Sequence, residues 1–146
     1  MEIINRKAKF DYEIDDTLEV GIVLTGTEIK SVRAGKANIK DSYAIIRNDE
    51  LYLLNSHIAE YAQGNRFNHE ETRSRKLLAH KKEILKLKSK VEMQGYTLIP
   101  LKMYFKAGRL KVLIGTARGK KNYDKRETIK NRDIEREMQK TIKYRY

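Results

Sequence analysis

Residue combinations that could catalyse a reaction are few in this sequence. The three histidines, His57, His69 and His80, lack the HExxH spacing of a zinc site, and no cysteine is present to serve as a ligand or a nucleophile. The acid pairs Asp15–Asp16 and Glu70–Glu71 are adjacent, so their carboxylates would point to opposite faces of a strand. No phosphate-binding loop, dinucleotide-binding glycine motif or serine elbow occurs. We therefore predict that the protein is not an enzyme and uses no metal or cofactor.

Basic side chains beside possible stacking groups favour RNA binding instead. They gather in two clusters, KSVRAGKANIK over residues 30–40 and GNRFNHEETRSRK over residues 64–76. Lysine and arginine neutralise phosphates, and Phe67 or His69 could stack on an unpaired base. The alternative is that each cluster is a solvated basic surface. The candidate RNA contacts are Lys30, Arg33, Lys36, Asn38, Arg66, Phe67, Arg75 and Lys76.

Alternating and β-branched segments predict that strands hold these clusters in place. Gly21 inside one such segment suggests a bulge or a sharp bend. Pro100 cannot donate a ladder hydrogen bond, so it marks a strand edge or a bulge. The expected elements are strands over residues 7–14 and 18–24, a hairpin over 42–58 that turns at Asn48–Asp49, and a hairpin over 96–117 that turns at Ala107–Gly108.

Two helices are expected between the strands. Residues 25–35 begin with Thr25 and Glu28 at the spacing of a capping box, and residues 75–95 carry an apolar stripe that ends at Gly95. Five or six antiparallel strands with a helix between hairpins favour a mainly β fold. We expect an OB-fold-like antiparallel β-barrel with two or three helices and a basic C-terminal tail. A ribosomal-protein-like α+β sandwich fits the same pattern.

Net charge divides the chain into two parts. The 146 residues hold 32 Lys and Arg against 20 Asp and Glu, and the resulting charge of +12 favours a polyanionic partner. Residues 118–146 hold 11 basic and 5 acidic side chains, so half of the net charge lies in a fifth of the chain. We expect an RNA-binding barrel over residues 1–117 and a tail over 118–146 that is disordered when free. A purely solubilising tail is the alternative.

Membrane and export signals are missing from the pattern of apolar residues. No apolar run approaches the roughly 20 residues that cross a bilayer, and the first residues do not form a signal peptide. The lack of cysteine is compatible with a reducing compartment. We expect a cytoplasmic protein without a membrane partner.

Six blocks of the chain together resemble one protein family. The blocks are NRKAKFDY, LTGTEIKSVRAGKANIKDSYA, GNRFNH, RKLLAHKKEI, GYTLIPLKMYFK and GKKNYDKR, and over residues 5 to about 133 they are similar to the SsrA-binding protein (SmpB) family. The resemblance implies an OB-like barrel, without enzymatic activity, that binds the D-loop and T-arm elbow of transfer-messenger RNA. It implies delivery of that RNA to stalled 70S ribosomes for trans-translation. The tail would occupy the decoding centre and become helical in the empty mRNA channel.

The resemblance also implies indirect partners and individual residue roles. Elongation factor Tu and alanyl-tRNA synthetase would be indirect partners of a monomer. Glu19 matches an acid at the family's RNA-facing site, and Leu78 and His80 match neighbouring positions on the long helix. Tyr123 stands where other members have histidine, so a stacking role carries over and a proton-dependent role does not. The tail residues implied to bind the ribosome are Gly119, Lys120, Lys121, Tyr123, Asp124, Lys125, Arg126, Lys130, Arg132 and Arg136.

Other classes of protein fit parts of this pattern. A ribosomal protein or a general OB-fold RNA chaperone would also be small and basic, but it would bind many RNAs with similar affinity. An RNA-modifying or RNA-cleaving enzyme would need a metal site or an acid–base pair, and the sequence offers neither.

Overall fold

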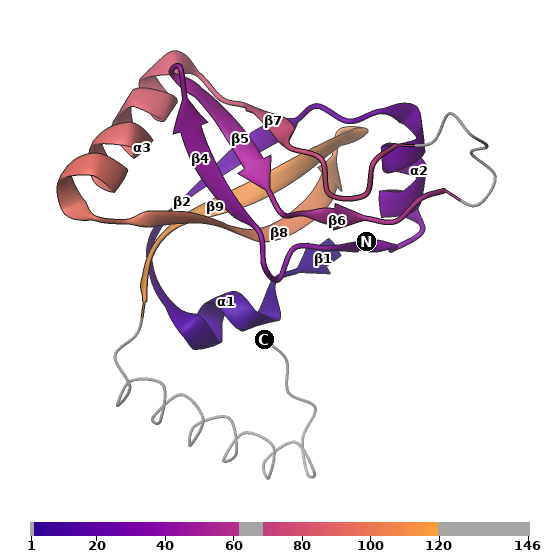
Figure 1. Cartoon of the computed structure of the whole chain (residues 1–146), viewed down its shortest axis with the longest axis horizontal. Helices are drawn as coiled ribbons and strands as arrows, with labels where there is room; N and C mark the ends of the chain where they lie inside the picture. The colour runs from indigo at the N-terminus through magenta and orange to yellow at the C-terminus, as the bar shows by residue number, and fades with distance from the viewer. Residues whose placement is uncertain (1, 62–68, 120–146) are drawn as a thin grey trace, which may run out of the picture.

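The strands of the chain close into an antiparallel barrel (Figure 1). The computed structural model describes residues 2–61 and 69–119. Six strands follow one another in the order β8–β4–β5–β7–β2–β9, and β9 returns to pair with β8. The predicted antiparallel β-barrel is therefore confirmed. The strands are β1 (Glu2–Ile4), β2 (Tyr12–Ile22), β3 (Ala37–Asn38), β4 (Tyr43–Arg47), β5 (Glu50–Leu54), β6 (His57–Ile58), β7 (Arg75–Leu78), β8 (Thr97–Lys106) and β9 (Arg109–Gly119).

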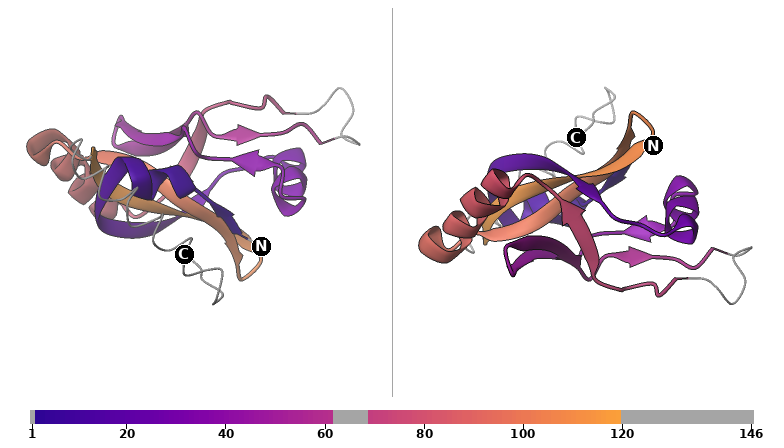
Figure 2. Two further views of the ribbon diagram at one scale, coloured as in Figure 1. Left: turned by 90° about the horizontal axis from the view of Figure 1, so that it is seen from below. Right: turned by 90° about the horizontal axis from the view of Figure 1, so that it is seen from above.

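Three helices are present among the described residues: α1 (Arg6–Asp11), α2 (Gly26–Arg33) and α3 (Lys81–Gln94). Helices α2 and α3 lie at opposite ends of the barrel (Figure 2). The predicted capping box of α2 is confirmed, because Glu28 N–H donates to Thr25 Oγ1 at 3.3 Å and Thr25 N–H donates to Glu28 Oε1 at 2.8 Å. The part of the chain that the structure describes has no helix long and apolar enough to span a membrane.

Alternating apolar side chains fill the barrel. Leu51 and Leu53 of β5 and Val112 and Ile114 of β9 are at most 1% exposed, while the residues between them are more open. Each such side chain contributes about 1.5–3 kcal/mol when it leaves water. This core fixes which face of each strand is left for a partner.

The turn residues of both hairpins were predicted correctly. The β4–β5 hairpin turns at Asn48 and Asp49, and the β8–β9 hairpin turns at Ala107 and Gly108, all with positive φ. Of the two alternatives predicted at Pro100, a strand edge or a bulge, the bulge is confirmed by a register shift between Pro100 and Lys102.

Gly21 marks a change of strand partner rather than a bulge. A bulge or a sharp bend was expected at Gly21. The register shift in β2 falls between Ile14 and Asp16, so the bulge is wrong, while the bend stays a prediction. Gly21 lies opposite Lys111 of β9 and Leu78 of β7, at the point where β2 passes from one partner to the other. A Cβ atom at this position would lie 3.3 Å from the Leu78 Cβ atom, so a side chain there would crowd the junction.

Two predicted elements begin later in the chain than expected. The expected strand over residues 7–14 begins only at Tyr12, because buried Asn5 caps a helix by accepting the Ala8 N–H at 3.2 Å. The expected helix over residues 75–95 begins only at Lys81. Residues 75–78 form β7 between β2 and β5, with side chains that alternate between buried and exposed.

The barrel extends beyond the boundary predicted after residue 117. Arg118 and Gly119 pair with Glu13 and Tyr12 of β2, so they belong to β9 rather than to the tail. The other predicted ribosome-binding residues lie outside the described residues, and so do Arg66 and Phe67. The predictions for those residues therefore remain predictions.

Candidate nucleic-acid interface

Exposed cations collect on α2 and in the turn that follows it. Lys30, Arg33, Lys36 and Asn38, all predicted RNA contacts, are exposed. The Arg33 guanidinium lies 4.7 Å from the centre of the Phe105 ring, and Lys30 Nζ lies 5.4 Å from the centre of the Tyr61 ring. These cation–π contacts hold the two charged groups near the barrel end without neutralising them. The surface can therefore contact a phosphate backbone.

Glu19 belongs to a second cluster, on the outer face of β2 and β8. The Tyr104 hydroxyl donates a short hydrogen bond to the Glu19 carboxylate, and Lys106 Nζ lies 3.4 Å from its Oε1. The Tyr104 hydrogen bond is the main cause of a lowered Glu19 pKa, with Lys106 adding to it. Burial, followed by the Glu19 hydrogen bond, raises the pKa of Tyr104 to about 12. At neutral pH the cluster therefore holds an ionised carboxylate against a neutral phenol.

Leu78 lies beside this cluster. It is 52% exposed and lies opposite Gly21, two positions along the same face of β2 from Glu19. An exposed apolar side chain next to a fixed acceptor suits contact with a ribose or base face. Leu78 therefore keeps its predicted place near Glu19, although it lies on a strand and not on the predicted helix.

His80 and Lys76 also remain exposed, with different surroundings. His80 is the N-cap residue of α3 rather than a residue on its face, and its backbone N–H donates to Glu83 Oε1 at 2.9 Å. Lys76 forms an exposed ion pair with Glu50 at 3.1 Å. Such a pair is weak, so Lys76 can exchange it for a phosphate.

The prediction that Arg75 binds RNA directly is wrong. Its side chain is fully buried, and its Nε donates to Glu28 Oε2 at 2.6 Å. Its Nη1 group donates to the Ser56 carbonyl at 2.9 Å and to the Ser56 hydroxyl at 2.9 Å. Alternation along β7 turns Arg75 and Leu77 inward and Lys76 and Leu78 outward. Arg75 therefore supports the interface from inside.

Glu28 balances the charge of this buried arginine. Burial on its own would raise the Glu28 pKa, but hydrogen bonds from Arg73, from the Thr25 N–H and from Arg75 lower it overall. Arg73 donates to both carboxylate oxygens, at 3.0 and 2.5 Å. The carboxylate therefore stays charged and joins α2 to the chain segment that leads into β7.

His69 is enclosed by the same region and is not free to stack on a base, contrary to the prediction. It is 7% exposed. Its Nε2 lies 2.8 Å from the Ile58 carbonyl, which can only accept, so Nε2 carries the hydrogen. Its Nδ1 then accepts from the Thr27 hydroxyl at 2.8 Å. His69 thereby ties the segment that leads into β7 to β6 and to α2.

Sequence reasoning missed the roles of Glu28 and Tyr104. The capping box already accounted for a glutamate at position 28. Nothing further in the sequence indicated that Glu28 is also the buried counterion of Arg75. The alternation of Lys102, Tyr104 and Lys106 along β8 is the signal that could have placed Tyr104 on the outer face. Its partner could not be read from the sequence, because Glu19 lies 85 positions away.

Comparison with known proteins identifies one matching family and several similar relatives. The family described as SmpB protein matches residues 2–144 of this chain. An SsrA-binding protein of Shouchella clausii (strain KSM-K16) is 60% identical over 141 residues, covering 97% of this chain and 90% of the relative. An SsrA-binding protein of Staphylococcus aureus (strain Newman) is 58% identical over 142 residues, covering 97% and 92%.

A solved structure also resembles this fold. It is described as "tmRNA-SmpB: a journey to the center of the bacterial ribosome". Its matching chain has a TM-score of 0.70 and 52% sequence identity, and the match covers 83% of this chain and 85% of that chain.

Proposed function

This chain belongs to the SmpB protein family, and we propose that it binds the tRNA-like domain of transfer-messenger RNA and delivers it to stalled ribosomes for trans-translation. The observation that carries the proposal is the 60% identity to an SsrA-binding protein across 97% of the chain. The exposed cations of α2 and the ordered Glu19 cluster supply a surface of suitable chemistry.

The barrel surface separates affinity from specificity in this proposal. Lys30, Arg33 and Lys36 contact phosphates and supply salt-dependent affinity. Glu19 accepts hydrogen bonds from base or ribose donors, because its carboxylate is ionised and held by Tyr104. Leu78 packs against the same nucleotide or its neighbour. The elbow where the D-loop meets the T-arm offers such donors on a folded RNA surface.

In this proposal the C-terminal tail binds the ribosome. Residues 120–146, which follow β9, hold 10 basic and 5 acidic side chains. Their net charge of +5 suits a groove walled by ribosomal RNA and the release of counterions there. In this proposal the residues from Lys120 to Arg126 occupy the decoding centre, and the following residues become helical in the empty mRNA channel.

The finer features of the proposal follow the family resemblance. The protein acts as a monomer in the cytoplasm and without catalysis of its own. It meets elongation factor Tu and alanyl-tRNA synthetase only through the RNA that it carries.

Sequencing the RNA that co-purifies with the full chain from its own cells tests the proposal. Transfer-messenger RNA should dominate the bound pool, and the purified pair should bind stalled ribosomes. Recovery of many unrelated RNAs in proportion to their abundance would contradict it and would favour a general RNA chaperone instead.

A further inference from the structure

The last two residues of β9 are supported by a neighbouring strand on one side only. Arg118 and Gly119 both pair with β2. On the other side, β8 begins at Thr97, which pairs with Ala117, so the pairing with β8 stops one residue before Arg118. The chain therefore leaves the barrel from a strand end that β8 does not hold.

The Arg118 side chain contacts the end of α3 at this point. Its guanidinium carbon lies 4.2 Å from the centre of the Tyr96 ring, and its Nη2 donates to the Gln94 carbonyl at 3.1 Å. A planar guanidinium suits both contacts, because its face stacks on a ring while its edge donates hydrogen bonds. The side chain thus takes the place of the missing contact with β8.

The C-terminal end of α3 is suited to receive a cation. The helix ends at Gly95, which has a φ of 72°, and the N–H groups of Gly95 and Tyr96 both bond to the Lys90 carbonyl. Gln94 is the last residue of α3, so its carbonyl has no partner within the helix. The last turn of α3 has no basic side chain of its own. Arg118 therefore supplies the positive charge that the helix dipole favours there.

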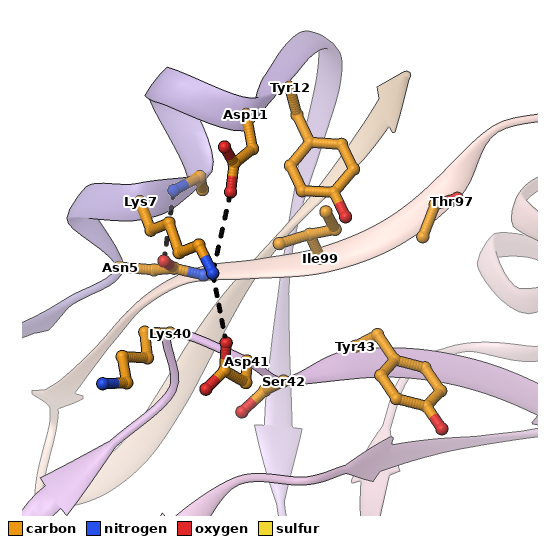
Figure 3. A pocket seen from close by; sticks show the side chains of 11 residues that line it. Asn5, Lys7, Asp11, Tyr12, Lys40, Asp41, Ser42, Tyr43, Thr97 and Ile99 are labelled. Atoms are coloured by element: carbon orange, nitrogen blue, oxygen red, sulfur yellow. Dashed lines mark hydrogen bonds and ion pairs between the residues drawn. The ribbon is translucent and has the colours of Figure 1, made fainter. Parts of the chain in front are cut away.

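The β2 side of the chain exit is fixed as well. Tyr12, which pairs with Gly119, directly follows α1. Asn5 begins this helix by accepting the Ala8 N–H (Figure 3), and its Nδ2 donates to the Pro100 carbonyl at 2.9 Å. Because α1 is tied to β8 in this way, the backbone opposite Gly119 has a fixed position.

A flexible chain loses the direction of its first residue within a few residues. The block from Lys120 to Arg126 follows Gly119 directly, so its starting direction depends on how Arg118 is held. We propose that Arg118, held by Tyr96 and the Gln94 carbonyl, is a positioning residue that directs the tail from the barrel into the decoding centre. The inference rests on the proposed function, because it takes the ribosome as the partner of the tail.

Spin labels on the full-length protein measure the direction of the tail without a ribosome. The chain has no cysteine, so Lys82→Cys in α3 and Asn122→Cys after β9 accept one label each. Arg118→Ala should broaden the distribution of distances between the two labels in pulsed electron resonance. Arg47→Ala, at an exposed arginine of β4, is the matched control and should leave the distribution unchanged. Equal widths with and without Arg118 would overturn the proposal.

A reconstituted tagging assay on stalled ribosomes tests the consequence. At saturating concentrations of the complex, Arg118→Ala and Tyr96→Leu should each slow tagging by about two- to fivefold, the range for one exposed cation–π contact. Both variants should keep the affinity for transfer-messenger RNA and the thermal unfolding of the unsubstituted chain. Tyr96→Phe keeps the ring and should tag at the original rate. An unchanged rate in Arg118→Ala would overturn the proposal.

Two combined variants distinguish positioning from a direct contact of Arg118 with RNA. If Arg118 acts through Tyr96, the double variant Arg118→Ala, Tyr96→Leu should tag no more slowly than Arg118→Ala alone. A Gly-Ser-Gly-Ser insertion after Gly119 should remove the effect of Arg118→Ala, because a flexible spacer erases the direction that the barrel gives to the chain. Additive losses in the double variant, or a full effect of Arg118→Ala behind the spacer, would assign Arg118 to RNA contact and overturn the positioning role.

The two measurements also separate this inference from the proposed function. If the unsubstituted chain neither bound transfer-messenger RNA nor supported tagging, the proposed function would be wrong. The spin-label distances would still show whether Arg118 directs the tail.

Discussion

Glu28 is the residue on which the interior of the interface depends. It is fully buried, and it is charge-balanced by Arg75, which is equally buried, and by Arg73 at the edge. Removing one partner from a buried pair leaves the other charge uncompensated, which costs far more than the loss of a surface contact. We therefore expect Glu28→Gln to lower the free energy of unfolding by about 3–5 kcal/mol, measured by urea denaturation.

The matched control for Glu28 is an exposed pair. Glu50 lies 3.1 Å from Lys76, and both side chains are more than 40% exposed. Glu50→Gln should change stability much less, because water screens the pair. Equal losses in the two variants would show that burial does not set the importance of Glu28.

The lowered pKa of Glu28 gives stability a defined pH dependence. Its folded-state pKa lies below the ordinary value of 4.5, so the unfolded chain takes up a proton at this site first as the pH falls. The contribution of Glu28 is complete above pH 4.5 and is lost as the pH falls through the folded-state pKa. Thermal unfolding between neutral pH and about pH 3 should show this loss, and Glu28→Gln should show a smaller one. Identical pH profiles for the unsubstituted chain and Glu28→Gln would show that Glu28 does not cause the loss of stability.

We expect the Glu19 carboxylate to strengthen specific RNA binding through a hydrogen bond, rather than to weaken binding through charge repulsion. Glu19→Gln should weaken binding of transfer-messenger RNA by at least about fivefold, as the loss of a charged hydrogen bond does. Tyr104→Phe keeps the carboxylate and removes the group that orients it, so it should cause a smaller loss. Filter binding at fixed salt checks both variants. Tighter binding by Glu19→Gln would make Glu19 an ordinary surface acid, since removal of a negative charge near RNA favours association.

At the scale of elements, the two hairpin turns differ in how well their residues suit them. Asn48 and Ala107 both adopt positive φ, at 52° and 51°. Asparagine tolerates this conformation, whereas an alanine Cβ is crowded in it. We expect Ala107→Asn to raise the free energy of unfolding by roughly 0.5–1 kcal/mol and Asn48→Ala to lower it by a similar amount. Urea denaturation measures both, and a less stable Ala107→Asn variant would contradict the argument.

Local chemistry made some elements predictable and left others ambiguous. The turns and the capping box of α2 depend on neighbouring residues, so the sequence specifies them. The short helix α1 depends on Asn5, whose buried side chain also bonds to Ile39 and Pro100. Its sequence alternates like a strand, and the Asn5 cap that begins the helix is itself held in place by these distant contacts. Strand β7 was likewise assigned to α3, because an apolar stripe continues from Leu77 into the helix.

At the scale of the whole molecule, two parts of the described surface lie toward opposite ends of β2. The Glu19 cluster lies near one end of this strand, while Tyr12 and the start of the tail lie at the other. The exposed cations of the candidate site were predictable from composition and spacing. The burial of Arg75 and His69 was not, because it depends on which strand face meets the core.

The final prediction follows from that division. A chain that ends at Gly119 keeps β9 intact, including the pairs that Arg118 and Gly119 form with β2, so it should fold. It also keeps α2 and the Glu19 cluster, so its affinity for transfer-messenger RNA should stay within about threefold of the full chain, because stacking and hydrogen-bond contacts of the barrel are unaltered. It should nonetheless fail to support tagging of nascent chains on stalled ribosomes, because it lacks the whole tail that follows β9. A gel-shift assay and a reconstituted tagging assay measure the two activities. Loss of RNA binding by the shortened chain would show that the tail belongs to the transfer-messenger RNA interface, and normal tagging would show that the ribosome does not need it.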